Sequence, residues 1–154
     1  MWPPRRVICV GAVVLKDDEV LLIRQAKGTS LEGQWSIPWG IVENEEYPST
    51  AALRETKEEG GVIAEIIGLL GIQNVSWESS IGIIYLCGHV SGSPQSDGGI
   101  ETDQAKYMSL EQIEALAEPV EPWSEWIAKR VLQGQHHVIP REANNPFRPH
   151  PAFL

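Results

Sequence analysis

The stretch that runs from Pro48 to a pair of glycines constrains the fold of this chain more than any other segment. It places Glu55, Glu58 and Glu59 close together. A proline suits the first position of a helix and a glycine suits its end, so we predict a helix that begins at residue 48 or 49 and ends at Glu59. At about 100° per residue, the three glutamates fall within an arc of roughly 100° on one side of this helix.

Three crowded carboxylates are costly unless positive charge lies against them. A divalent cation would supply that charge, because Mg²⁺ and Mn²⁺ bind hard oxygen ligands held by a rigid element. Ions of this kind act on phosphate oxygens, so the pattern predicts metal-dependent chemistry on a phosphate group. A solvated acidic helix without a metal is the alternative reading of the same residues.

The glutamates belong to a longer pattern. It reads Gly40, five residues, Glu46, seven residues, and then Arg54-Glu55-Thr56-Lys57-Glu58-Glu59-Gly60-Gly61-Val62. This pattern resembles the Nudix box of the Nudix hydrolase family. Thr56 is a mild departure, since an aliphatic residue is usual at its position.

The resemblance implies an enzyme that hydrolyses a diphosphate linkage in a nucleoside triphosphate or in a nucleotide sugar such as ADP-ribose. It implies Mg²⁺ as cofactor, with Mn²⁺ as a substitute, and metal ligands at Glu55, Glu58 and Glu59. Glu55 is also the candidate catalytic base. The residues expected to shape the box are Gly40, Glu46, Arg54 and Gly61. A nucleotide-sensing module without activity is the competing hypothesis, and the full set of box carboxylates favours the enzyme.

Trp39 stands where the family usually has a glycine. In related enzymes the residue before the box glycine gives its backbone carbonyl to a metal, and Trp39 can do the same. A tryptophan does not adopt a positive φ without strain, so the loop can differ in shape. Its indole either packs over the loop or stacks on substrate.

Three acidic positions outside the helix are further candidates. Family members can take a metal ligand or the catalytic base from a residue ahead of an aromatic-x-Ser-Leu stretch, which here is Tyr107 to Leu110. Glu101 is our candidate for that role, Asp103 is its rival, and a solvated loop carboxylate is the alternative. Glu43 can reach a second metal or remain an exposed charge.

Substrate contacts are expected from three side chains: Arg24, Trp39 and Tyr85. Arg24 follows the second strand and either meets phosphates or lies on a solvated face. Tyr85 is one of several aromatic residues that can stack on a nucleobase or pack in the core, the others being Trp35, Trp77 and Tyr107.

Composition limits the partners and the compartment. The formal net charge of −9 and pI near 4.9 disfavour nucleic acid and anionic membranes, so a small nucleotide-type substrate is expected. No segment is long enough to span a bilayer. Cys9 and Cys87 lie in apolar runs and are expected to be buried free thiols, which favours the cytoplasm.

The order of predicted elements suggests a single α/β domain. Strands are expected at 7–15, 20–24, 35–38, 62–72 and 81–90, the first two as a hairpin. A capping box at Ser109 and Gln112 and a proline at 122 open two later helices. We therefore expect a mixed sheet covered on both faces, the α/β/α sandwich that the resemblance also implies. This domain spans residues 1–134, and residues 135–154 form a proline-rich tail. The tail either reaches a second subunit in a homodimer or is disordered.

Overall fold

The computed structural model describes residues 7–75 and 80–154. Its helices and strands follow the chain in this order: β1 (Ile8–Lys16), β2 (Glu19–Gln25), β3 (Trp35–Ser36), β4 (Trp39–Ile41), α1 (Pro48–Gly60), β5 (Ile63–Val75), β6 (Ser80–Ser91), β7 (Thr102–Met108), α2 (Leu110–Glu114), α3 (Pro122–Leu132), β8 (Ile139–Glu142) and β9 (Ala152–Phe153).

The strands form one mixed sheet in the order β3-β2-β1-β6-β5-β8-β9, with β4 paired to β1 and β7 paired to β2. β1 and β6 run parallel, and the other strand pairs are antiparallel. β2 pairs with β1 only beside their hairpin, whereas β4 pairs with the opposite end of β1, from Cys9 to Gly11. The sheet therefore opens between β1 and β2, and β4 lies in that opening.

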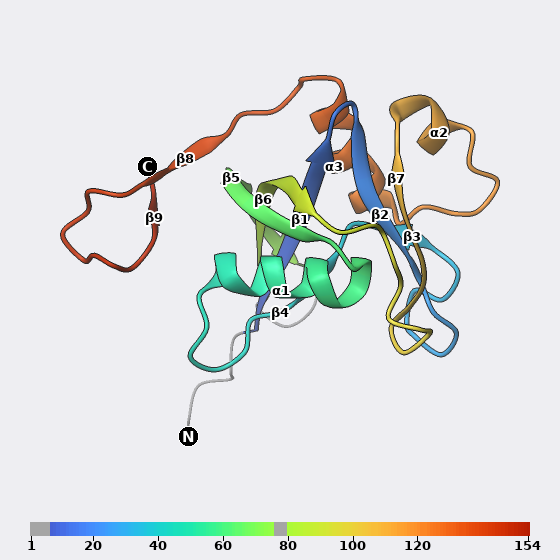
Figure 1. Ribbon diagram of the computed structural model, residues 1–154, viewed down its shortest axis with the longest axis horizontal. Helices are drawn as coiled ribbons and strands as arrows, with labels where there is room; N and C mark the ends of the chain where they lie inside the picture. The colour runs from blue at the N-terminus through green and yellow to red at the C-terminus, as the bar shows by residue number, and fades with distance from the viewer. Residues whose placement is uncertain (1–6, 76–79) are drawn as a thin grey trace.

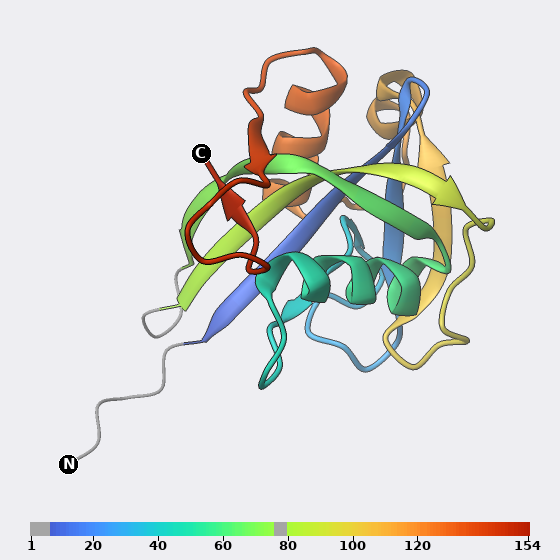
Figure 2. The ribbon, with the colours of Figure 1, turned by 60° about the vertical axis from the view of Figure 1, so that its left-hand side comes forward.

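Helices cover both faces of the sheet, so the expected α/β/α arrangement is confirmed (Figure 1, Figure 2). On one face, Val10, Ala12 and Val14 of β1 pack with α1. On the other face, Val13 packs with residues of α2 and α3. Burial on both sides explains why β1 is a continuous apolar run instead of an alternating pattern.

The local signals of α1 act as predicted. Pro48 occupies the first turn, and Gly61 ends the helix with φ 71° while its N–H donates to the Lys57 carbonyl. The capping box at Ser109 and Gln112 and the helix that opens at Pro122 are also confirmed. Such signals operate over a few residues, so sequence alone reveals them.

Four strands were not predicted: β4, β7, β8 and β9. The strand expected at 35–38 ends at Ser36 as β3, and β4 begins after Pro38. β7 has a mostly polar sequence and owes its conformation to pairing with β2 along most of its length. β8 and β9 lie in the tail, where β8 pairs with β5 and then with β9. The ring of Phe153 packs against Tyr85, with 5.4 Å between centroids.

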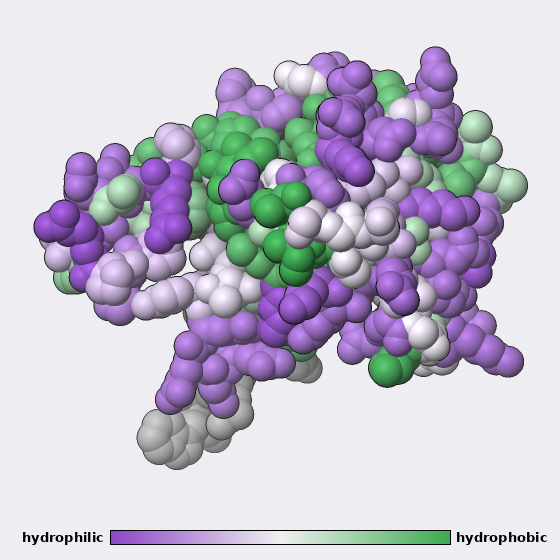
Figure 3. All heavy atoms as spheres, in the orientation of Figure 1, coloured by the Kyte–Doolittle hydropathy of each residue, from purple (hydrophilic) through white to green (hydrophobic). Residues whose placement is uncertain are grey.

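The surface beside the tail is mixed in character. Figure 3 shows hydrophobic side chains gathered between α1 and β5, on a face that is otherwise mostly hydrophilic. Cys9 and Cys87 are free and buried, as expected. Within residues 7–75 and 80–154, no helix is both long and apolar enough to cross a membrane.

Candidate active site

Helix α1 presents two of its three glutamates to the interior. Glu55 and Glu59 are one turn apart and buried, with exposed fractions of 7% and 2%. Glu58 points to solvent, where its side chain is 59% exposed. The acidic face predicted from the sequence is therefore divided by the packing of α1 on the sheet.

Glu101, which directly precedes β7, completes a cluster with the two buried glutamates. One carboxylate oxygen from each of Glu55, Glu59 and Glu101 lies within 4.8 Å of the others. Glu101 thus joins the site, while its rival Asp103 is engaged elsewhere. Because Glu101 is far in sequence from the two glutamates of α1, it joins them only through the approach of β7 to α1.

The cluster has an electrostatic cost that a cation would relieve. Burial is the larger cause and the neighbouring carboxylate of Glu55 the next, and together they raise the pKa of Glu59 to about 9. Burial likewise raises the pKa of Glu55, although the adjacent Arg54 opposes this effect. Carboxylate oxygens from three side chains are the kind of donor set that Mg²⁺ or Mn²⁺ prefers, and a cation would offset the mutual repulsion of their charges. The residues of this cluster therefore fit a divalent metal ion.

The backbone of β4 lies directly against the carboxylates. The N–H of Trp39 donates to Oε1 of Glu59 at 3.2 Å. A Cβ at Gly40 would lie 2.1 Å from Oε1 of Glu55, so no larger residue fits there without displacing that side chain. Trp39 belongs to a strand and has no positive φ, because the non-glycine residues with positive φ in the described chain are Asp17 and Glu45. Trp39 therefore avoids the backbone strain that a positive φ would impose on a tryptophan at this position.

Arg54 links the loop before α1 to the acidic helix. Its guanidinium contacts both carboxylate oxygens of Glu46, at 2.8 and 3.2 Å, and the carbonyl of Ile41 at 3.1 Å. The same group also reaches Glu55 at 2.7 Å and Glu58 at 3.1 Å. Hydrogen bonding to Arg54 lowers the pKa of Glu46. The Glu58 carboxylate is held by Arg54 and lies outside the three-carboxylate cluster, but it lines the same cleft. Its role as a metal ligand therefore stays a prediction.

Several other predicted site residues lie elsewhere. Arg24 pairs with Glu118 and with Asp103, its Nε and Nη2 lying 2.7 and 3.1 Å from the Asp103 carboxylate. Tyr85 is buried in the core on the α1 side of the sheet. Glu43 has a largely exposed side chain, 3.9 Å from Arg54. The structure brings none of these side chains into the carboxylate cluster.

The remaining aromatic candidates divide between core, surface and undescribed chain. Trp35 is fully buried in the core on the α3 side. Tyr107 packs at the edge of the other core and bonds His89 through its hydroxyl at 2.7 Å. Trp77 lies outside the described residues.

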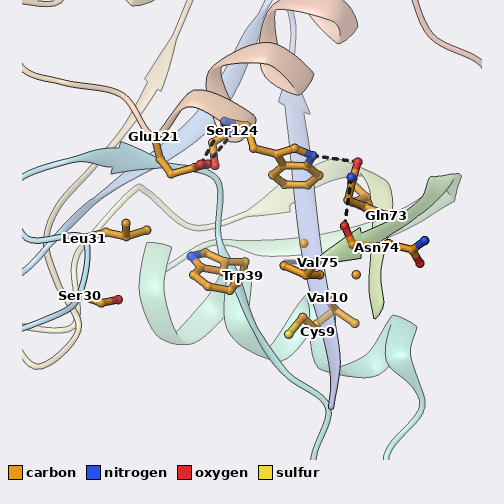
Figure 4. A pocket seen from close by; sticks show the side chains of 14 residues that line it. Cys9, Val10, Ser30, Leu31, Trp39, Gln73, Asn74, Val75, Glu121 and Ser124 are labelled. Carbon is orange, nitrogen blue, oxygen red and sulfur yellow. Dashed lines mark hydrogen bonds between the residues drawn. The ribbon is translucent and has the colours of Figure 1, made fainter. Parts of the chain in front are cut away.

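An apolar pocket of about 570 Å³ adjoins the carboxylate cleft, and Trp39 and Cys9 line both. Its walls come from β1, β5, the loop before β3 and the start of α3 (Figure 4). Trp123 lines it from α3 and donates from Nε1 to Oε1 of Gln73 at 3.4 Å. Sequence reasoning did not find Trp123, Gln73 or Asn74 as pocket residues. No local signal marks them, since their pocket forms only when α3 meets β5.

Comparison with known proteins gives a consistent result. A family model described as NUDIX domain matches residues 5–130. Relatives include a "MutT-like protein" of Streptomyces ambofaciens, 30% identical over 100 residues, which are 64% of this chain and 58% of that protein. Another is an "ADP-ribose pyrophosphatase" of Methanocaldococcus jannaschii, 28% identical over 114 residues, which are 71% of this chain and 66% of that protein.

The match therefore spans less than two thirds of the length of either relative. The fold is also similar to that of a NUDIX hydrolase from Nitrosomonas europaea. The TM-score is 0.76 at 22% sequence identity, and the superposition covers 87% of this chain and 74% of the other. This likeness supports the architecture of the sheet and its helices.

Proposed function

This chain belongs to the NUDIX domain family, and from that membership we propose that it hydrolyses a diphosphate linkage in a nucleoside diphosphate derivative, with Mg²⁺ or Mn²⁺ bound. The observation that carries this proposal is the cluster of Glu55, Glu59 and Glu101 within 4.8 Å, beside an apolar pocket. Clustered carboxylates suit a metal that meets phosphates, and an apolar pocket suits the organic part of the substrate.

Glu55, Glu59 and Glu101 would hold the cation. When bound, a divalent cation neutralises the diphosphate oxygens and stabilises the charge that develops on the leaving phosphate. Arg54 keeps the Glu55 carboxylate in place through its 2.7 Å contact. The N–H of Trp39 orients Glu59 in the same way, so two ligands are fixed before substrate arrives.

Glu55 is our candidate for the base. Burial raises its pKa, which brings a carboxylate closer to the range in which it can accept a proton. Water would lose its proton to Glu55 as its oxygen attacks phosphorus, and the bridging P–O bond would break to leave two phosphate groups. Glu101 is the second candidate, because it is the more exposed member of the cluster.

The substrate we favour is a nucleotide sugar such as ADP-ribose, with nucleoside triphosphates as the second class. The name of the M. jannaschii relative supports the first class. The pocket supports a flat aromatic group, since Trp39 and Trp123 both line it. Amide side chains of Gln73 and Asn74 at the same pocket can bond the edge of a base.

The decisive experiment is a metal-dependent turnover screen over nucleotide sugars and nucleoside triphosphates, with Glu55→Gln and Glu101→Gln measured on the best substrate. We expect Glu55→Gln to retain the fold and to lower kcat by about 10² to 10⁴, the range for loss of a general base. Wild-type turnover in Glu55→Gln would reject Glu55 as the base. Tight binding of one ligand without turnover of any would instead favour a nucleotide-sensing module.

Trp123 tests the pocket separately from the chemistry. Replacing Trp123 with Ala should raise KM about tenfold for a substrate with an aromatic base, and leave kcat close to that of the wild type. Trp123→Phe keeps a ring and should give an intermediate KM. An unchanged KM in Trp123→Ala would remove this pocket from substrate binding.

A further inference from the structure

The loop that leads into β7 is organised around one carboxylate, that of Asp97. Its Oδ1 accepts hydrogen bonds from the backbone N–H groups of Gly99, Ile100 and Thr102, at 3.2, 2.9 and 3.1 Å. Its Oδ2 accepts from the N–H of Glu101 at 2.8 Å. A single side chain thus accepts hydrogen bonds from four backbone N–H groups between Gly99 and Thr102, the residue at which β7 begins.

Thr102 ties this loop to the acidic helix. Its side chain is fully buried, and its Oγ1 accepts from the N–H of Asp97 at 3.2 Å and donates to the carbonyl of Glu59 at 2.8 Å. The loop is therefore anchored at the C-terminal end of α1, on the backbone of Glu59, which itself carries one of the clustered carboxylates.

Glu101 sits between these two anchors. Its N–H is held by Asp97, and its carbonyl accepts from the N–H of Ala26 at 2.8 Å. Its carboxylate nevertheless lies in an exposed position against two like-charged groups, Glu55 and Glu59. Repulsion would favour movement of an unrestrained loop toward solvent, so the backbone bonds oppose a force that acts on the Glu101 side chain.

We propose that Asp97 is a positioning residue that holds Glu101 in the carboxylate cluster and thereby sets the affinity of the site for a divalent cation. The inference rests on the proposed function, because Glu101 matters here as a ligand of the metal. Asp97 itself lines neither the carboxylate cleft nor the apolar pocket. Its proposed effect on the site therefore passes through the backbone of the loop and not through direct contact with the metal or the substrate.

The test is Asp97→Asn, measured alone and in a Glu101→Gln background. Asparagine preserves the size of the side chain but turns one of its two acceptor oxygens into a donor, so bonds to the four amides cannot all persist. We expect the Kd for Mn²⁺, measured by calorimetry, to rise about 10- to 100-fold and kcat to fall by a similar factor with KM unchanged, the range for loss of a residue that orients a metal ligand. Asp18→Asn, in the turn between β1 and β2, makes the same change of charge and should leave both values unaltered.

The double variant separates positioning from a general effect on the fold. If Asp97 acts through Glu101, adding Asp97→Asn to Glu101→Gln should change the Mn²⁺ affinity no further. A further loss in the double variant, or wild-type affinity in Asp97→Asn alone, overturns the inference. Wild-type protein that binds no Mn²⁺ overturns the proposed function and this inference with it.

Hydrogen exchange in the wild type needs neither a variant nor a metal. The amides of Ile100, Glu101 and Thr102 should exchange slowly, because Asp97 accepts from all three. Asp97→Asn, or Asp97→Ser where the asparagine variant fails to fold, should accelerate their exchange. Fast exchange in the wild type contradicts the inference, even where Mn²⁺ binds as the proposed function requires.

Discussion

Replacing Glu59 with glutamine should stabilise the metal-free protein. The Glu59 side chain is 2% exposed, and burial together with the nearby Glu55 carboxylate raises its pKa to about 9. Glutamine keeps an oxygen that can accept the Trp39 N–H, and its amide can donate toward Glu55. The variant therefore removes the free-energy cost of keeping this carboxyl protonated in the fold, without removing the hydrogen bond from Trp39.

The magnitude follows from the pKa difference between the folded and unfolded chain. The unfolded carboxyl has a pKa of 4.5. At about pH 7.5, which is about three pH units above that value, the unfolded chain has released the proton that the folded protein still holds. At about 1.4 kcal/mol per unit, this costs the metal-free fold about 4 kcal/mol. A buried glutamine also loses hydration, so we expect about half of this to be recovered. For a chain of this size that gain corresponds to a rise in Tm of about 5 °C.

The sign of the pH dependence is a second part of this prediction. A carboxyl whose folded pKa exceeds its unfolded pKa favours the fold at low pH, and that advantage is lost as pH rises from about 4.5 to 9. The free energy of unfolding of the metal-free wild type should therefore fall over this range. The Glu59→Gln variant should show a flatter profile.

Thermal unfolding at several pH values, with chelator and then with excess Mn²⁺, measures all of these effects. Mn²⁺ at about 100 times its Kd should stabilise the wild type by about 2.7 kcal/mol and the variant by much less. Glu65→Gln, an exposed position on β5, is the matched control for loss of one charge. A metal-free Glu59→Gln protein that is less stable than the wild type, or one that keeps the full Mn²⁺ response, would refute the reasoning.

Two further predictions concern the packing around α1. Gly40→Ala should weaken Mn²⁺ binding, measured by calorimetry, at least tenfold, because its Cβ would displace the Glu55 carboxylate. Gly71→Ala is the control and should leave the affinity unchanged, because no atom lies within 4 Å of its Cβ. Equal Mn²⁺ affinities in the two variants would show that β4 can shift to accommodate the added methyl group. Thr56→Val should change the free energy of unfolding in urea by less than about 1 kcal/mol, because the buried hydroxyl bonds the Ala52 carbonyl of its own helix. A loss above about 2 kcal/mol would give that hydrogen bond a larger role in stability.

The sequence predicted α1 well and the residues opposite it poorly. Pro48 and Gly61 act on their own turns, so the bounds of the helix follow from a few neighbouring residues. Glu101 could be proposed from the resemblance but not chosen over Asp103 by physical reasoning, because the two lie in the same polar segment. In the fold, β7 pairs with β2, Asp103 contacts Arg24, and Glu101 lies against the two buried glutamates, which favours Glu101.

Sequence by itself determined that this chain carries an acidic helix with defined ends and a NUDIX-type spacing of charges, since caps and helical period are local properties of the backbone. Tertiary structure alone decided which carboxylates share the site. Packing of α1 on β1 buried Glu55 and Glu59, turned Glu58 toward Arg54, and left a place for Glu101 from a distant loop. It also made a pocket beside Trp39 by joining β5 to α3. These contacts depend on how the sheet opens between β1 and β2, and no short stretch of residues encodes that opening.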